Sequence, residues 1–214
     1  LPYSALIINS RGLIEVRMKR RIEFGCLLIL TILWFLLISA WLFAQSSVQM
    51  SKQSFRIEYR PDLGVPVMVD WQVSRETLGE AKREPNFKFK EDKECPKPRV
   101  KSKHYNKSGY HRGHMCPAGD RSKDISSMKS TFIMSNVCPM LPSINTGAWK
   151  RTEEEERRLA KSGHVVNVRA CALYYPDDTL WIGGGRVAVP HAFIKFLWTD
   201  DEAKIYKQYI IENK

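Results

Sequence analysis

An uninterrupted apolar run divides this chain of 214 residues into two unequal parts. From Phe24 to Phe43 every residue is uncharged and almost every one is apolar, and three basic residues, Lys19, Arg20 and Arg21, stand just before the run. A spanning helix needs about 20 such residues, whereas a cleavable signal usually has an apolar region of about 7–15. The run over residues 24–43 therefore predicts an export signal or a membrane anchor, and it confines a globular fold to the residues that follow.

The residues around the run leave cleavage and retention open. Ala44 suits the last position before a cut, but Leu42 fits the small-x-small pattern poorly. The basic cluster predicts that the N-terminal side stays in the cytoplasm and that the rest is exported, so that the domain is periplasmic, secreted or membrane-anchored. Met18 fits a natural start, because MKRR and the apolar run read as a complete leader.

We therefore expect four segments in the chain. They are extraneous residues over 1–17, a signal peptide or anchor over 18–44, a polar linker over 45–54, and one domain over 55–214. A hydrophobic content of 43% is enough for a single domain with an ordinary core.

The charge balance favours a polyanionic partner. Lys and Arg number 34 against 23 Asp and Glu, a net charge of +11, and most of this excess lies beyond the apolar run. Neutralising phosphates releases counterions, which drives the binding of basic proteins to nucleic acid. A basic surface kept for solubility is the alternative.

Four cysteines follow the apolar run, and in an exported domain they would permit two disulfides. Three pairings are open, and the sequence does not separate them. No C-x2-C pair is present, which makes a structural zinc site the weaker alternative. The residues concerned are Cys95, Cys116, Cys138 and Cys171.

Local patterns predict an α+β domain in which strands flank one strong helix. Alternation and β-branched residues predict strands, Pro and Gly mark the turns, and Glu and Arg in helical register predict the helix. We expect strands over 55–60, 65–74, 130–137, 164–175 and 179–190, a long basic surface loop over 83–110, and helices over 144–163 and 202–214.

The stretch YHRGHMCPAGD holds the first candidate site residues. HRGH alone is weak evidence, because two histidines near a glycine occur in many turns. Downstream come SNV, which ends a predicted strand, and INTGAWKRTEEEER, which opens the predicted helix. The residues that carry the pattern are His111, Arg112, Gly113, His114, Ser135, Asn136, Asn145, Trp149 and Glu153.

With these residues the sequence resembles the DNA/RNA non-specific endonuclease family, the ββα-metal nucleases. The family's hallmarks are Asp-Arg-Gly-His at the end of a strand, a strand closing on Ser-Asn, and Leu-Asn-x-x-x-Trp opening a helix that carries a glutamate. The resemblance runs from about residue 56 to 196. It implies a ββα-metal (His-Me finger) nuclease fold, with a central antiparallel sheet flanked by helices.

The resemblance also implies hydrolysis of DNA and RNA with Mg²⁺, or Mn²⁺ in its place, leaving 5′-phosphate ends. His114 would be the general base, which suits an imidazole with a pKa near neutrality. Asn145 would be the metal ligand, because a hard cation prefers oxygen and keeps most of its waters. On one continuous helix Glu153 would lie about 12 Å along the axis from Asn145, so we expect it to act through metal-bound water. We expect Glu154, Glu155 and Glu156 to form a solvated helix face.

Four further residues receive roles. Arg112 is expected to support the site rather than to react, although its guanidinium suits phosphate. Asn136 is expected to fix the site geometry or the attacking water, with a strand-end cap as the alternative. In the basic loop Lys90 and Arg99 are expected to touch the nucleic-acid backbone. Lys90 stands where relatives often have an arginine, so the bidentate fork is lost there.

Three departures from the family motivate a second hypothesis. His111 replaces an aspartate, Met140 replaces a common glutamine, and the segment after Trp198 is short for the family. A catalytically impaired nuclease-like protein that only binds nucleic acid is therefore the alternative function. A membrane-tethered interaction domain, in which HRGH is only a turn, is a third. Oligomeric state and any preference between DNA and RNA are left open.

Overall fold

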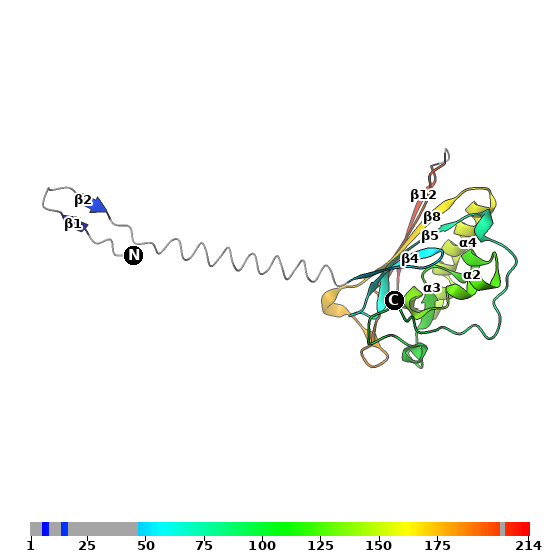
Figure 1. Cartoon of the computed structure of the whole chain (residues 1–214), viewed down its shortest axis with the longest axis horizontal. Helices are drawn as coiled ribbons and strands as arrows, with labels where there is room; N and C mark the ends of the chain where they lie inside the picture. The colour runs from blue at the N-terminus through cyan, green and yellow to red at the C-terminus, as the bar shows by residue number, and fades with distance from the viewer. Residues whose placement is uncertain (1–5, 9–13, 17–46, 202–203) are drawn as a thin grey trace. The chain divides into compact units, whose positions relative to one another are not determined.

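A computed structural model describes residues 6–8, 14–16, 47–201 and 204–214 of the chain (Figure 1). Two compact units are distinguished, Leu1–Gln45 and Ser46–Lys214. In the first, β1 (Leu6–Ile8) pairs with β2 (Ile14–Val16) in an antiparallel hairpin. The predicted leader over 18–44 lies outside the described residues. Within the described ranges, no helix is both long and apolar enough to cross a membrane.

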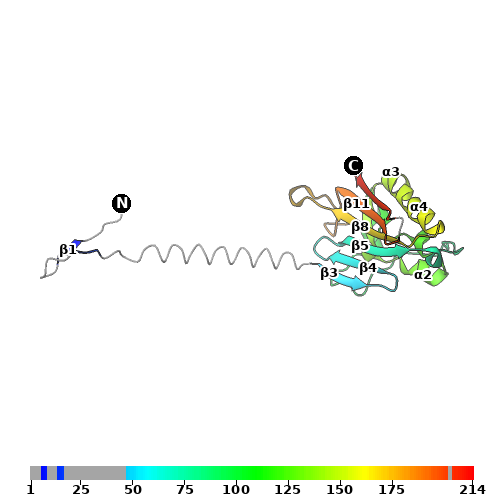
Figure 2. The same ribbon diagram turned by 90° about the horizontal axis from the view of Figure 1, so that it is seen from above.

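The second unit is built on a six-stranded antiparallel sheet of order β12-β11-β8-β5-β4-β3 (Figure 2). Side chains alternate across it, as the burial pattern of β4 shows: Phe55, Ile57 and Tyr59 are buried and the residues between them are more exposed. The strands are β3 (Val48–Ser51), β4 (Phe55–Arg60), β5 (Val65–Val73), β8 (Val166–Leu173), β11 (Ala192–Thr199) and β12 (Tyr206–Glu212).

Helices cover one face of this sheet (Figures 1 and 2). They are α2 (Ile125–Ser130), α3 (Pro142–Thr146) and α4 (Ala148–Lys161). β6 (His111–His114) and β7 (Val137–Met140) pair antiparallel in a two-stranded sheet, which we call the β6–β7 hairpin although α2 lies between them in the chain, and β7 leads into α3. The fold class predicted from the sequence, a central antiparallel sheet flanked by helices, is confirmed.

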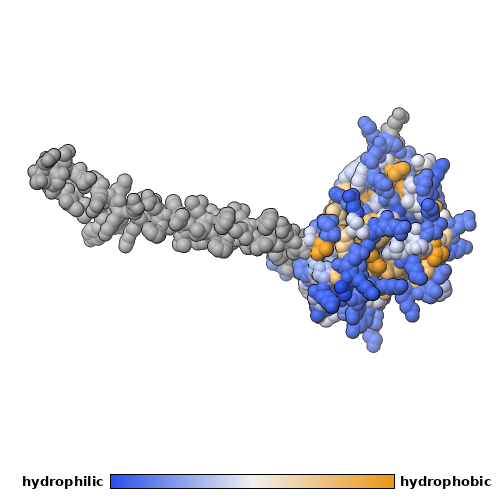
Figure 3. Space-filling view, in the orientation of Figure 1, coloured by the Kyte–Doolittle hydropathy of each residue, from blue (hydrophilic) through white to orange (hydrophobic). Residues whose placement is uncertain are grey.

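Short elements complete the second unit. A hairpin joins β9 (Trp181–Ile182) to β10 (Val187–Ala188). The 3-10 helices are η1 (Arg75–Thr77), η2 (Ser102–Tyr105), η3 (Ala118–Arg121), η4 (Met134–Asn136) and η5 (Pro176–Asp178). The visible surface is mostly hydrophilic, with scattered apolar residues (Figure 3).

Four predicted elements were wrong in type or extent. Residues 130–137 are mostly buried, but they form the end of α2, a turn and η4, and only Val137 belongs to a strand, β7. Residues 202–214 were expected to be helical, but the whole of Tyr206–Glu212 pairs with β11, a strand that was not predicted either. The strand expected over 179–190 is the β9–β10 hairpin. The expected linker contains β3, which pairs with β4 at the edge of the sheet.

The predicted helix over 144–163 is divided at Gly147. This residue has φ −109° and ψ −103°, and a Cβ there would lie 2.3 Å from the carbonyl oxygen of Ser143. Asn145 and Glu153 therefore stand on two helices, α3 and α4, and the spacing expected for one continuous helix does not apply.

One predicted solvated glutamate lies in the core. Glu156 is fully buried and accepts a hydrogen bond of 2.6 Å from the ammonium of the equally buried Lys195. That ammonium also lies 3.9 Å from the centroid of the Trp149 ring, a cation–π contact. The expected solvated face was therefore wrong at Glu156, whereas Glu154 is exposed.

The disulfides expected from an exported domain are absent from the described residues. Cys95, Cys116, Cys138 and Cys171 are free thiols, and the first three are buried. Burial raises the pKa of Cys95 and of Cys116 to about 12. Such thiols stay protonated and unreactive, and they act as small core residues.

Candidate active site

The β6–β7 hairpin holds the HRGH motif in register with β7. His111 lies opposite Met140, and His114 lies opposite Val137. A Cβ at Gly113 would come within 2.8 Å of the Met140 side chain, so glycine is needed at this position. Met140, where relatives often have glutamine, is fully buried against Gly113. The departure at Met140 therefore replaces a polar contact by packing.

The imidazole of His114 packs in a triangle with two phenylalanine rings, whose own centroids are 5.1 Å apart. The ring centroids of Phe89 and Phe132 each lie 4.8 Å from that of His114. The guanidinium of Arg83 lies 4.9 Å from the centroid of Phe132, and the backbone oxygen of His114 accepts a hydrogen bond of 3.0 Å from Nε1 of Trp149. These contacts fix the position of His114 at the end of β6.

Burial keeps His114 neutral. Removal from solvent, assisted by the positive charge of Arg83, lowers the pKa of His114 from 6.5 to about 3. Nε2 of His114 is enclosed without a hydrogen-bond partner, although the residue as a whole is partly exposed. A neutral imidazole is the form that can accept a proton.

Asn136 fixes the chain directly after His114. Its Oδ1 accepts a hydrogen bond of 2.9 Å from the backbone nitrogen of Cys116. Its Nδ2 donates to the backbone oxygens of Cys116 and Thr131, at 2.9 and 3.1 Å. Asn136 is fully buried, and its amide is occupied by these bonds. Asn136 therefore ties the backbone that follows β6 to the backbone at Thr131.

Arg112 ties the basic loop to β6. Its Nη2 donates to the backbone oxygen of Ser102 at 2.6 Å and to Oδ1 of Asn106 at 2.8 Å. Its guanidinium also lies 5.6 Å from the centroid of the Tyr105 ring. These contacts connect Arg112 to η2 and to the residue that follows it.

His111 and Asn145 are in contact. Nδ2 of Asn145 on α3 lies 3.3 Å from Nδ1 of His111 on β6. His111 is exposed and Asn145 is partly exposed, so this pair faces the surface at the mouth of the hairpin. The residue that departs from the family pattern is thus the neighbour of the expected metal ligand.

Glu153 lies on α4 with its side chain 18% exposed. Burial raises its pKa from 4.5 to about 7, against the opposing charge of Lys195. Its ion-pair contact is a long one, 4.0 Å to Nη1 of Arg157. Arg157 in turn bonds to the buried Asp120 at 2.9 Å, and Asp120 accepts from Nε1 of Trp71 at 2.9 Å.

The two basic residues expected to touch substrate differ in their contacts with the rest of the protein. The side chain of Lys90 is exposed, while its backbone bonds to Phe132 and Met134 at 2.9 and 2.8 Å. Lys90 therefore lies on the segment next to Phe132, whose ring packs against His114. Arg99 is folded onto its own loop, donating to the backbone oxygens of Cys95 and Lys93 at 2.7 and 2.9 Å.

The residues present fit a hydrated hard cation. Among the described residues no group of three or more His, Cys, Asp or Glu side chains could hold a metal ion. A cation such as Mg²⁺ needs only one or two protein oxygens, because it keeps several waters. Asn145 offers an amide oxygen, and Glu153 offers a carboxylate whose burial is poorly compensated.

Several residues around the site were not predicted from the sequence. Phe89 and Phe132 pack against the ring of His114, and Arg83 contributes the positive charge near it. They lie in segments expected to be a surface loop and a strand. Arg157 had a weak signal, because it follows Glu153 by one helical turn.

A two-stranded hairpin ending on a neutral histidine, followed by helices that carry an asparagine and a glutamate, is the arrangement of a ββα-metal nuclease. The family model described as "DNA/RNA non-specific endonuclease" matches residues 42–214, and the chain belongs to this family.

Known relatives agree with this assignment. The chain is 35% identical to a nuclease from Nostoc sp. over 56% of this chain and 44% of that protein. It is 32% identical to mitochondrial endonuclease G from Homo sapiens over 69% of this chain and 53% of that protein. It also resembles EndoG in a crystal structure of the EndoG/EndoGI complex, with TM-score 0.70 and 27% identity over 78% of this chain and 74% of that chain. The chain spans about half the length of the curated relatives it matches.

Proposed function

We propose that this chain is a divalent-cation-dependent endonuclease that hydrolyses phosphodiester bonds in DNA and RNA. The observation that carries the proposal is the neutral His114 at the end of β6, packed against two phenylalanine rings, with Asn145 and His111 at the mouth of the same hairpin. Family membership and the basic charge of the chain support nucleic acid as substrate.

His114 is the general base of this proposal. Since Nε2 is enclosed, Nδ1 is the atom that accepts the proton from the attacking water. A bound phosphodiester brings negative charge next to the imidazole, which raises the pKa of His114 and strengthens it as a base. The rings of Phe89 and Phe132 keep the imidazole in one orientation, so little reorganisation is needed.

Asn145 and Glu153 would hold the cation, Asn145 through its amide oxygen and Glu153 through water. When bound, Mg²⁺ or Mn²⁺ stabilises the negative charge that develops on the phosphate oxygens. The contact between Nδ2 of Asn145 and His111 leaves Oδ1 of Asn145 available for this role. Arg112 and Asn136 act by positioning, since Arg112 binds the backbone of η2 and Asn136 binds the backbone that follows β6.

Lys90 and Arg99 are proposed to contact the nucleic-acid backbone without sequence preference. Lys90 suits this role as it stands, because its side chain is exposed. Arg99 would have to leave the carbonyl oxygens of Cys95 and Lys93 to reach a phosphate. We therefore expect a larger loss of affinity from Lys90→Gln than from Arg99→Gln.

A nicking assay tests the proposal. The purified full-length chain is incubated with supercoiled plasmid and with a structured RNA, with Mg²⁺, with Mn²⁺, or with a chelator. We expect cleavage of both substrates with either cation and none with the chelator. Absence of cleavage with every divalent cation, together with salt-sensitive binding of the plasmid, would instead establish the alternative function, a catalytically impaired nucleic-acid-binding protein. The replacement of a family aspartate by His111 favours that alternative.

We further propose that the domain acts outside the cytoplasm, as a periplasmic, secreted or membrane-anchored protein. The support is the apolar run over residues 24–43 with its preceding basic cluster. Protease digestion of intact and of lysed cells tests this. In a host with one membrane, the domain should be found in the medium or should be degraded by protease added to intact cells. A domain that stays with the cells and is degraded only after lysis would contradict the proposal.

A further inference from the structure

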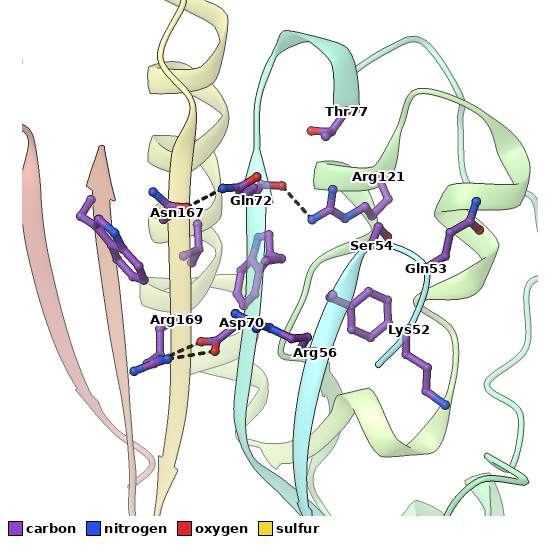
Figure 4. A pocket seen from close by; sticks show the side chains of 14 residues that line it. Lys52, Gln53, Ser54, Arg56, Asp70, Gln72, Thr77, Arg121, Asn167 and Arg169 are labelled. Atoms are coloured by element: carbon purple, nitrogen blue, oxygen red, sulfur yellow. Dashed lines mark hydrogen bonds and ion pairs between the residues drawn. The ribbon is translucent and has the colours of Figure 1, made fainter. Parts of the chain in front are cut away.

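A recess of about 500 Å³ opens near the start of β4, over the neighbouring strands β5 and β8 (Figure 4). Its walls come from these three strands, from the turn before β4, from η3 and from β11. None of the lining residues was predicted as a catalytic, metal-binding or substrate-binding residue, and Trp71 alone among them bonds to Asp120, which pairs with Arg157 beside Glu153. Figure 4 shows Arg121 and Gln72 on one side of the recess, with Asp70, Arg169 and Arg56 on another.

Arg121 places a positive charge in the wall without a counterion. The residue is 4% exposed, and its Nη2 donates to the backbone oxygen of Gln72 at 2.8 Å. Its Nε is buried without a hydrogen-bond partner, and none of the ion pairs in the described part of the chain includes Arg121. A buried charge without a partner is costly in free energy, so this wall favours an anion.

Arg56 adds a second uncompensated charge. It lies opposite Asp70 in the β4–β5 register, but Arg169 already binds both oxygens of Asp70, at 2.7 and 2.9 Å. Arg56 is exposed and forms no ion pair within the residues that the structure describes. Lys52 at the rim is engaged by Asp92 and Glu94 at 2.8 and 2.9 Å.

Polar and aromatic groups adjoin these charges. Nε2 of Gln72 donates to Oδ1 of Asn167 at 2.8 Å, which leaves the amide oxygen of the exposed Gln72 free to accept (Figure 4). Trp198 on β11 lines the recess and is partly exposed. An exposed indole is a stacking surface for a nucleobase.

We propose that this recess binds the phosphomonoester of a nucleotide, with the phosphate at Arg56 and Arg121 and the base against Trp198. Arginine forks match phosphate oxygens, and two of them neutralise its charge. A free 5′-mononucleotide and the 5′-phosphorylated end of a strand share this chemistry. The choice of a nucleotide rests on the proposed function, whereas the anion site rests on the charges alone.

Calorimetry of the full-length chain in chelator tests the site without cleavage. The probes are thymidine 5′-monophosphate, thymidine, inorganic phosphate, and a thymidine tetranucleotide with and without a 5′-phosphate. We expect saturable binding of the mononucleotide, weaker binding of phosphate and none of thymidine. A preference for the phosphorylated tetranucleotide over the mononucleotide would identify a strand end as the source. Equal affinity for phosphate and mononucleotide would overturn the assignment of a nucleotide.

Two arginine variants locate the binding. Arg56→Gln should weaken mononucleotide binding about tenfold, because it removes a charged hydrogen bond. Arg186→Gln, which changes an exposed arginine outside the recess, should leave it unchanged. Arg56 is exposed, so its replacement should not unfold the chain. Equal affinities of the two variants, or no saturable binding by the parent, would overturn the proposal.

Plasmid cleavage by the same samples separates the two proposals. We expect Arg56→Gln to cleave as the parent does. If the parent binds the mononucleotide through Arg56 but never cleaves, the proposed function is wrong and the proposal for the recess is supported. If it cleaves without such binding, the recess proposal fails alone.

Discussion

His111 and Asn145 meet across the mouth of the β6–β7 hairpin, with Nδ1 of one 3.3 Å from Nδ2 of the other. An aspartate, the family's usual residue at this position, would also accept a hydrogen bond from the Asn145 amide. Unlike an imidazole, it would bring a negative charge beside the expected cation ligand. The substitution therefore bears on how tightly a cation is held.

The first prediction concerns this substitution. His111→Asp should reduce the Mg²⁺ concentration needed for half-maximal plasmid nicking about tenfold, because groups that contact a metal ligand influence metal affinity by such factors. Mn²⁺ binding measured by electron paramagnetic resonance should tighten in parallel. His111→Asn, which supplies a hydrogen-bonding group without charge, is the matched control. A folded His111→Asp chain with no tighter Mn²⁺ binding would show that this site is adapted to histidine.

The second prediction concerns stability against pH. Burial lowers the pKa of His114 to about 3, below the 6.5 of an unfolded chain. Between these values the unfolded chain binds a proton that the folded chain does not, so His114 makes stability fall as pH falls from 6.5 to 3. Burial raises the pKa of Glu153 to about 7, above 4.5, so Glu153 makes stability fall as pH rises from 4.5 to 7.

The two single variants should therefore change the pH dependence in opposite directions. Urea unfolding in chelator, at pH values between 4.5 and 6.5, measures the free energy of unfolding. Relative to the parent, His114→Gln should lower the slope of stability against pH and Glu153→Gln should raise it, each by at most about 1.4 kcal/mol per pH unit. Parallel curves for the parent and both variants would show that neither group titrates as its burial predicts.

The third prediction concerns the hydrogen bond between Trp149 and the backbone oxygen of His114. Trp149→Phe keeps an aromatic ring in the core but removes the donor, and it should cost about 1–3 kcal/mol of stability, allowing for the lost ring volume. Nicking at saturating Mg²⁺ should also decrease, because His114 loses a support. Trp181→Phe, which changes an exposed indole outside the site, serves as the control. A Trp149→Phe chain that nicks as fast as Trp181→Phe would contradict a positioning role.

The fourth prediction concerns the buried pair of Lys195 and Glu156. Lys195→Met should cost about 3–5 kcal/mol, because it leaves the Glu156 carboxylate buried without its partner. Adding Glu156→Leu should recover much of that loss, since two apolar side chains need no compensation. Thermal unfolding of the two single variants and the double variant forms the cycle. Additive losses in the double variant would mean that the two groups do not depend on each other.

The sequence predicted those parts of the fold that depend on local pattern. β4, β5 and β8 carry alternating or β-branched residues between clear turn signals, and they lie where predicted. The C-terminal strand β12 was predicted as a helix, because Lys, Gln and Glu suit helices. Its pairing with β11 along the whole strand, a long-range contact, decides the outcome. Gly147 divided the main helix for a comparable reason, a close approach to the backbone at Ser143.

The candidate site was predicted in its motif residues but not in its surroundings. His114, Asn136 and Asn145 were found because their spacing matches a known pattern. Phe89 and Phe132 were missed, because no periodicity shows whether a phenylalanine packs against a catalytic side chain or in the ordinary core. The contact between His111 and Asn145 depends on how α3 packs against β6, which residue order does not specify. Glu156 was assigned to the surface because four consecutive glutamates give no sign of which one faces inward.

The central claim is that His114 is the base, and a rate comparison tests it most directly. Full-length parent, His114→Ala and His164→Ala chains are each incubated in excess over supercoiled plasmid with saturating Mg²⁺, and the single-turnover nicking rate is measured. His164 pairs with Asp201 outside the site, so its variant controls for the loss of an imidazole. We predict that His114→Ala nicks at least about a hundredfold more slowly, the contribution typical of a general base, and that His164→Ala nicks at the parent rate. Equal rates for the parent and a folded His114→Ala chain would contradict the account.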